Sequence, residues 1–326
     1  MTKVAVVQAA TVLFDTPATM AKVREWVGRA AETGAQIVVF PEGFIGGYPK
    51  GLDMGSFVGG RTPAGRDDFL RYWNSSVRID GPEMAEVADL ATEFGITIVI
   101  GIIEREHGTL YCAVATVAPE QGMIAYHRKL MPTGHERLLW GMGDGSTMPV
   151  VETPHGVMGT VICWENHLPL LRHHMYEQGV QIWCAPTLDD RELWATSMRH
   201  IAYEGRVFVL SACQYIERAD CPDDYDCVLG NEPDTVLMNG GSCIISPLGE
   251  VLAGPVYGEE ALLTAEIDLD EIVRAKYDLD VVGHYSRPDI FQLYVNTRAN
   301  PQTVTGPPRT VAPSADDQQE PTVTLP

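Results

Sequence analysis

Residues 159–179, GTVICWENHLPLLRHHMYEQG, change from the pattern of a strand to that of a helix within a few positions. The apolar run over residues 157–163 predicts a buried strand, and the apolar spacing over residues 168–178 predicts a helix. Asn166 is the expected N-cap, and Pro169 fits a first helical turn. Because open α/β folds carry their sites at the carboxyl ends of strands, this stretch predicts an α/β fold with a site at Cys163.

Cys163 is a candidate nucleophile, because a helix N-terminus favours the thiolate over the thiol. We therefore expect a rigid, exposed thiol with a lowered pKa. An intracellular cysteine is more often buried and inert, and this stretch alone leaves both readings open. Cysteines elsewhere lack such a setting: Cys112, Cys184, Cys213 and Cys243 lie in apolar strand patterns typical of a core, and Cys221 and Cys227 lie in an acidic loop, where carboxylates raise a thiol pKa.

Strands and helices alternate along the rest of the chain. Helices are predicted at residues 17–34, 82–95 and 191–204, and strands at residues 4–9, 36–40, 96–103, 180–185, 207–212, 241–247 and 262–267. Residues 111–118 and 123–130 flank a turn and predict a hairpin. The Gly- and Pro-rich residues 43–65 predict a functional loop or lid. This order favours a layered α/β fold with mixed sheets.

The composition changes only near the C-terminus. Residues 1–300 show no sharp shift and predict one folded domain, whereas Pro, Thr, Asp and Gln dominate residues 301–326 and predict a disordered tail.

The charge and cysteine content narrow the class of protein. The 326 residues are 45% hydrophobic and carry a formal net charge of −21, which disfavours nucleic-acid and membrane-surface partners. The sequence offers no signal peptide and no stretch apolar enough to span a membrane. Seven cysteines without scaffold-like spacing fit free thiols. We therefore expect a soluble, cytoplasmic protein.

A nucleophilic cysteine needs a base, and Glu42 follows the apolar strand at residues 36–40. Burial there would raise the pKa of its carboxyl toward neutrality, as suits a general base. A carboxylate that closes a turn is the common alternative, and histidines are further candidates: His167, His173, His174 and His200. Lys129 ends the second hairpin strand, where a cation is also common.

Glu42, Lys129 and Cys163 each lie in a short motif that resembles those of a known family. VVFPE at residues 38–42, HRKLMPT at 127–133 and VICWE at 161–165 resemble, in that order, the nitrilase (carbon-nitrogen hydrolase) superfamily. Further similarity to true nitrilases of plants and bacteria lies in FPEGFIGGYPKG, HRKLMPTGHERLLWGMGDGS, MRHIAYEGRVFVLSACQ and VVGHYSRPD. The resemblance covers roughly residues 3–297, and a Trp after the cysteine is typical of the nitrilase branch.

The resemblance implies an α-β-β-α sandwich that hydrolyses an organic nitrile to the carboxylic acid and ammonia through a cysteine thioimidate and thioester. Cys163 would be the nucleophile, Glu42 the base and Lys129 the cation that stabilises the negative intermediate, with Glu136 positioning the substrate or the base. Substrate contacts are expected from Tyr48, His135 and Trp164. No metal or cofactor is implied. Self-association to a dimer and longer spirals is implied.

Three alternatives remain open. An amidase or N-carbamoyl hydrolase would use the same residues, although Trp164 and HYSRPD at residues 284–289 argue against it. A metal-binding module could use His167, His173 and His174, but adjacent histidines do not share a helix face. A catalytically inactive filament protein would not need all three of Glu42, Lys129 and Cys163.

Overall fold

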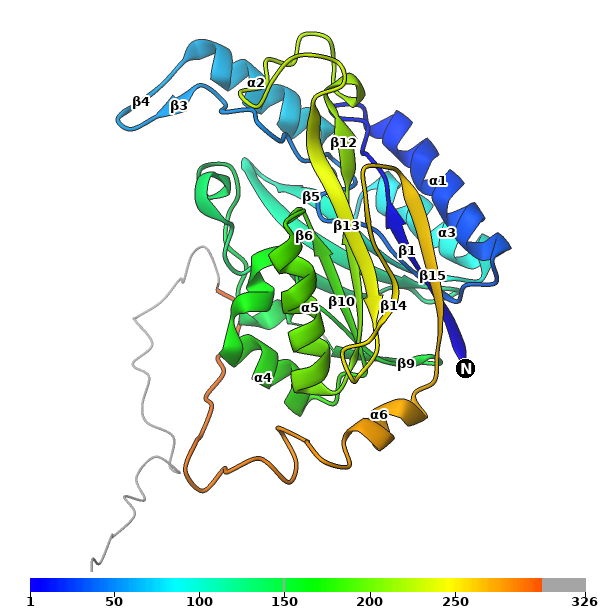
Figure 1. Cartoon of the computed structure of the whole chain (residues 1–326). Coiled ribbons are helices and arrows are strands. Elements are labelled where there is room, and N and C mark those ends of the chain that lie inside the picture. Colours follow the sequence, from blue (N-terminus) through cyan, green and yellow to red (C-terminus); the bar gives the residue numbers. More distant parts are fainter. Residues whose placement is uncertain (149, 301–326) are drawn as a thin grey trace, which may run out of the picture.

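A computed structural model describes residues 1–148 and 150–300; the tail predicted at residues 301–326 lies outside them. Two sheets lie face to face (Figure 1). The first runs in the order β15 (Ala261–Ile267), β1 (Thr2–Gln8), β2 (Ile37–Val39), β5 (Thr97–Glu106), β6 (Thr109–Ala118) and β7 (Gly122–Arg128). The second runs β12 (Tyr215–Glu217), β13 (Val236–Ile245), β11 (Phe208–Cys213), β10 (Ile182–Thr187), β9 (Gly156–Thr160) and β8 (Val150–Thr153), with β14 (Val251–Tyr257) paired to β13.

Both sheets are mixed, as the sequence predicts. In the first, β1 pairs in parallel with β2 and β2 with β5, whereas β5, β6 and β7 pair antiparallel. In the second, β9, β10 and β11 are parallel neighbours, and β8, β13, β12 and β14 pair antiparallel. The parallel strands bring their carboxyl ends to one edge of each sheet, where the candidate residues lie.

Strand alternation separates the layers, because successive side chains point to opposite faces of a sheet. Val4 and Val6 of β1 pack with Phe208 and Leu210 of β11 in the core between the sheets. Val38 of β2 instead joins the outer core under the helices.

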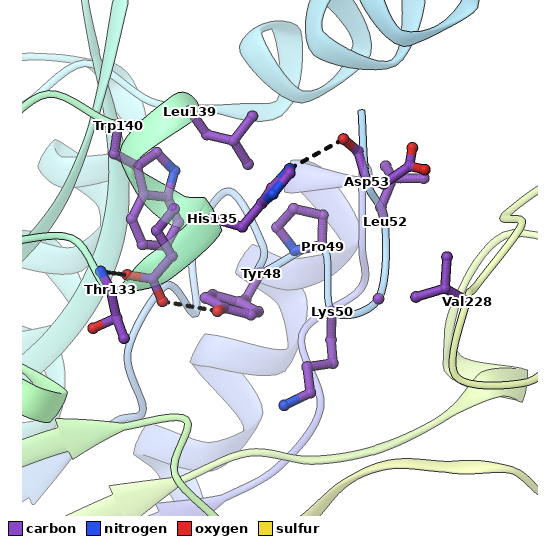
Figure 2. Close-up of a pocket in the computed structure, with 12 residues that line it drawn as sticks. Tyr48, Pro49, Lys50, Leu52, Asp53, Thr133, His135, Leu139, Trp140 and Val228 are labelled. Carbon is purple, nitrogen blue, oxygen red and sulfur yellow. Dashed lines mark hydrogen bonds between the residues drawn. The ribbon is translucent and has the colours of Figure 1, made fainter. Parts of the chain in front are cut away.

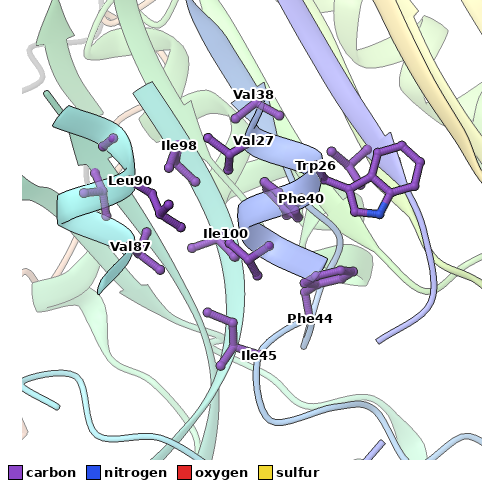
Figure 3. Packing of buried hydrophobic residues seen from close by; sticks show 14 of the residues in the cluster. Trp26, Val27, Val38, Phe40, Phe44, Ile45, Val87, Leu90, Ile98 and Ile100 are labelled. Carbon is purple, nitrogen blue, oxygen red and sulfur yellow. The ribbon is translucent and has the colours of Figure 1, made fainter. Parts of the chain in front are cut away.

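Helices cover the two outer faces. On the first sheet, α1 (Thr16–Glu32) and α3 (Pro82–Phe94) bury Trp26, Val27, Val87 and Leu90 against Ile98 and Ile100 (Figure 3). On the second sheet, α4 (Pro169–Glu177) and α5 (Glu192–Gly205) pack through the buried cluster that includes Met175, Trp183, Trp194 and Met198. The layers are therefore helix, sheet, sheet and helix, and the predicted sandwich is confirmed.

Several elements differ from the prediction. The expected loop at residues 43–65 holds a small hairpin, β3 (Ser56–Phe57) and β4 (Gly60–Arg61), and leads into α2 (Pro63–Ser75). Helix α2 was missed because it buries few residues, Gly65, Tyr72 and Ser75, and so lacks an apolar stripe. Its start is set by the Thr62 side chain, which accepts a hydrogen bond from the Gly65 amide. The chain also forms α6 (Asp270–Ala275) and short 3-10 turns η1 (Gly134–Leu138), η2 (Gly145–Thr147), η3 (Cys163–His167) and η4 (Arg218–Asp220).

Because Gly101 of β5 has no side chain, the backbone that follows β2 can pass close to it. A Cβ at this position would lie 2.3 Å from the Pro41 carbonyl oxygen and 2.7 Å from the Glu42 Cα. These are backbone atoms, which do not move aside cheaply.

We predict that Gly101→Ala displaces Glu42, lowers the free energy of unfolding by about 1–3 kcal/mol and lowers kcat at least about tenfold. Thermal unfolding and steady-state kinetics would measure the two effects. Gly28→Ala in α1 is the control, because its Cβ would meet the Phe94 ring at an ordinary 3.5 Å. Unchanged stability and kcat in Gly101→Ala would contradict the close approach.

Candidate active site

Glu42, Lys129 and Cys163 come from different strand ends. Glu42 follows β2 and Lys129 follows β7 in the first sheet, whereas Cys163 follows β9 in the second. The Glu42 carbonyl accepts a hydrogen bond from Gln214 Nε2 at 2.9 Å, and Gln214 Oε1 accepts one from the Thr11 amide at 3.0 Å. The backbone of the candidate base is therefore fixed from the second sheet.

Lys129 lies fully buried between two carboxylates. Its Nζ donates to Glu42 Oε1 at 2.7 Å and to Glu136 Oε2 at 2.8 Å. Its amide donates to the Cys112 carbonyl at 2.8 Å, and its carbonyl accepts from the Gly143 amide at 2.8 Å. The extended backbone and both carboxylates thus hold the ammonium in one place.

Glu136 is oriented by its own turn and by the loop after β2. Its Oε2 also accepts a hydrogen bond from the Thr133 amide at 2.6 Å, and its Oε1 accepts one from the Tyr48 hydroxyl at 2.8 Å. The structure therefore brings Glu42, Lys129, Glu136 and Tyr48 together.

Burial and charge set the protonation of this group. Burial raises the pKa of Glu42, opposed by the charge of Lys129. Burial lowers the pKa of Lys129, but the charge of Glu42 and the neighbouring acidic groups outweigh it and leave that pKa well above its ordinary value. Lys129 therefore stays a cation, and Glu42 is a stronger base than an exposed glutamate.

Cys163 occupies a backbone conformation that a side chain seldom adopts. Its φ is +49°, in the left-handed region where residues other than Gly, Asn and Asp are uncommon. Asn166 holds this turn: its Nδ2 donates to the carbonyls of Val161 at 3.0 Å and Cys163 at 2.7 Å, and its Oδ1 accepts from Trp183 Nε1 at 2.7 Å. Strained backbone at a candidate nucleophile is a recurrent feature of active sites.

The prediction of an exposed thiol with a lowered pKa is wrong. Cys163 is only 5% exposed, and burial, followed by the charge of Glu42, raises the pKa of its thiol to about 12. Cys163 is the first residue of turn η3, and α4 begins only at Pro169, with Leu168, not Asn166, as N-cap. The favourable field of a helix falls off within its first turn. The resting group is a neutral thiol that needs a base.

Glu165 connects the Cys163 turn to the strand that carries Lys129. Its carboxylate accepts a hydrogen bond from the Ile162 amide at 3.0 Å, contacts the Leu130 amide and lies 3.0 Å from His127 Nε2. Both Glu165 and His127 are buried. This bridge was not predicted from the sequence, although both residues lie inside the quoted motifs.

Two further side chains, those of Thr187 and Cys112, contact the candidate residues, and Cys112 was missed as a member of the site. The Thr187 hydroxyl at the end of β10 donates to Cys163 Sγ at 3.3 Å. Cys112 is buried, as its apolar pattern predicts, but its thiol also donates to Glu42 Oε1 at 3.3 Å. Residue spacing gives no signal for such contacts, because they join strands distant in the sequence.

The predicted histidines do not join this group. His200 is exposed and lies 3.6 Å from Glu204, and His173 lies 3.4 Å from Glu177. His167 packs against the Trp164 and Trp194 rings. In the described ranges, no cluster of three His, Cys, Asp or Glu residues is arranged to hold a metal ion.

A cavity of about 380 Å³ opens beside Glu136 (Figure 2). Apolar and aromatic side chains supply much of its wall: Tyr48, Pro49, Leu52, Leu139, Trp140 and Val228. His135 also lines it and donates from Nε2 to the Asp53 carbonyl at 3.2 Å. Tyr48 and His135 both line this cavity, and their expected role in binding substrate stays a prediction.

Trp164 does not line this cavity. It is 42% exposed, and its indole N–H donates to Asp189 Oδ2 at 2.8 Å. The Arg191 guanidinium lies 5.0 Å from its ring. The expected role of Trp164 in binding substrate stays a prediction.

The comparisons identify the family. Residues 3–277 match the carbon-nitrogen hydrolase family. The chain is 54% identical to a nitrilase of Bradyrhizobium diazoefficiens, over 91% of this chain and 92% of that relative. It is 53% identical to a bifunctional nitrilase/nitrile hydratase of Lupinus angustifolius, over 92% of this chain and 88% of that relative. An amidase from Nesterenkonia sp. shares the fold, with a TM-score of 0.63 at 17% identity, covering 83% of this chain and 92% of that chain.

The chain therefore belongs to the carbon-nitrogen hydrolase family. The resemblance to true nitrilases is confirmed by relatives that match about nine-tenths of the chain at half identity or more. No helix within the described residues is long and apolar enough to cross a membrane.

The raised pKa of Cys163 leads to a spectroscopic prediction. A thiolate absorbs in the ultraviolet, and a thiol does not. We expect the difference spectrum between the unmodified protein and Cys163→Ala to show no thiolate step between about pH 6 and 9. A Cys163-dependent thiolate step with a midpoint below about pH 9 would contradict a neutral resting thiol.

Proposed function

We propose that this protein hydrolyses an organic nitrile to the carboxylic acid and ammonia, with Cys163 as nucleophile, Glu42 as general base and Lys129 as the stabilising cation. The observation that carries this proposal is the buried Lys129–Glu42 pair, whose charges both act on the Cys163 thiol. The relatives named as nitrilases support the substrate class. A mutant of the Nesterenkonia amidase supports the nucleophile, since its structure shows the acetamide moiety of fluoroacetamide added covalently at the active-site cysteine.

The first half of the reaction forms a thioimidate. Glu42 takes the proton of the Cys163 thiol as sulfur attacks the nitrile carbon, and this proton passes to the nitrile nitrogen. Water, deprotonated by Glu42, then adds to the same carbon. The fixed charge of Lys129 stabilises the negative charge that develops, in a site where burial strengthens the interaction.

The second half releases both products. The nitrogen of the tetrahedral intermediate gains two protons, one returned by Glu42 and one from the hydroxyl group of the intermediate, and it leaves as ammonia. The hydroxyl oxygen becomes the carbonyl of a thioester on Cys163. A second water, again activated by Glu42, attacks the thioester and frees the acid with return of the thiol. Expulsion of sulfur in place of ammonia would give the amide. The Lupinus relative, named as bifunctional, supports including this branch.

Glu136 is the proposed positioning residue, because it bonds both Lys129 and Tyr48. Tyr48 and His135 are the proposed substrate contacts. We also propose that residues 1–300 form one domain, that the protein self-associates into dimers and spirals, as the family resemblance implies, and that it is cytoplasmic. The seven free cysteines support a reducing compartment.

The first experiment is ammonia release from a panel of nitriles, each paired with its own amide. We expect turnover of nitriles and little turnover of amides. Cys163→Ala should lose at least about 1,000-fold of the activity and keep the same melting temperature. Cys243→Ala, a buried thiol in the α4–α5 core, is the matched control. Turnover of amides alone would assign the amidase alternative, and an active, folded Cys163→Ala would refute the nucleophile.

The base role of Glu42 predicts the acid limb of the pH profile. Glu42 must be ionised to accept the proton, and burial raises its pKa. Activity should therefore fall with decreasing pH through a midpoint above the ordinary value of 4.5. The profile of kcat/KM would measure this midpoint, and Glu42→Gln should abolish the activity. Glu152→Gln, at an exposed carboxylate of β8, should leave the profile unchanged.

A further inference from the structure

The two oxygens of the Glu42 carboxylate have different surroundings. Oε1 accepts a hydrogen bond from Lys129 Nζ at 2.7 Å and another from the Cys112 thiol at 3.3 Å. Oε2 is fully buried, and among the described residues it has no hydrogen-bond partner. A buried carboxylate oxygen without a donor is costly, so it is the oxygen with more to gain from a proton.

We propose that Cys112 is a positioning residue: its thiol, together with Lys129, holds Glu42 Oε1 so that Oε2 remains the oxygen that exchanges protons during turnover. This inference rests on the proposed base role of Glu42. It assigns a task to a buried thiol that the mechanism otherwise leaves unused.

The alternation of side chains along β6 places Cys112 in the core between the sheets. Cys112 and Val114 of β6 face the core between the sheets, whereas Ala113 and Ala115 face the helices. The Cys112 carbonyl also accepts the Lys129 amide at 2.8 Å. One residue therefore contacts both the base and the backbone of the cation.

A single hydrogen bond would leave the carboxylate free to turn. The terminal torsion of a glutamate side chain is broad and roughly two-fold, so one donor at Oε1 does not define its plane. A second donor from another strand defines the plane of the carboxylate. The S–H group is a weak donor that occupies Oε1 without competing for Oε2.

Several charged and titratable groups among the described residues surround Glu42. The charge of Lys129 lowers the pKa of Glu42 and that of Glu136 raises it, and the charge of Glu42 in turn acts on Cys112, Cys163, Tyr48 and Tyr72. The hydrogen bond from Cys112 favours the ionised carboxylate, so its removal should raise the pKa of Glu42 further.

The test compares Cys112→Ala with Cys112→Ser. Both remove the sulfur, but only serine restores a donor to Oε1. We expect Cys112→Ala to lower kcat about tenfold with little change in KM, and to move the acid limb upward by about half a pH unit. Cys112→Ser should return kcat to within about threefold and restore the limb.

Cys243→Ala is the control for loss of a buried thiol, and melting temperatures check folding. If Cys112→Ala and Cys112→Ser change kcat equally and leave the acid limb in place, Cys112 contributes only packing and the inference is overturned. If Cys112→Ala fails to fold, the test compares the midpoint of the acid limb in Cys112→Ser with that in the unmodified protein. Because serine is a stronger donor, this midpoint should stay the same or fall, and a higher midpoint would overturn the inference. An active Glu42→Gln would instead refute the proposed base, which separates that failure from this one.

Discussion

The burial of one ammonium between two carboxylates is the constraint on which this site depends. Removing Lys129, Glu42 and Glu136 from water costs several kcal/mol per ion, and only close pairing offsets that cost. The loss of one partner would leave an uncompensated charge in the core. The backbone contacts of Lys129, the Gln214 bond to Glu42 and the turn at Glu136 all serve to keep the three groups within hydrogen-bonding distance.

The same burial determines the state of the nucleophile. A dry site that strengthens the Lys129–Glu42 interaction also disfavours a thiolate at Cys163, and Glu42 adds its own negative charge nearby. The proposed chemistry therefore couples sulfur attack to proton transfer, with no preformed thiolate. The positive φ of Cys163 and the Asn166 bonds fix the backbone that carries the sulfur.

The site is divided between the two sheets. Glu42 and Lys129 belong to strand ends of the first sheet, and Cys163 and Thr187 belong to strand ends of the second. Reactive geometry then depends on how the sheets pack. The buried Glu165–His127 pair and the Gln214 bond to Glu42 join the sheets close to the reacting groups, where a small displacement would have a large effect on rate.

The sequence by itself determined most of the strand and helix order, because local periodicity lies within contiguous segments. Its short motifs also carried the resemblance that implied the sandwich class, the family and the candidate residues Glu42, Lys129, Cys163 and Glu136. Helix α2 was not predicted from the sequence, because it buries only part of one face. Only the tertiary structure decided the buried, neutral thiol of Cys163, the contact of Cys112 with Glu42 and the Glu165–His127 bridge. Burial and cross-sheet contacts depend on which distant strands pack together, and the spacing of residues along the chain does not encode those distances.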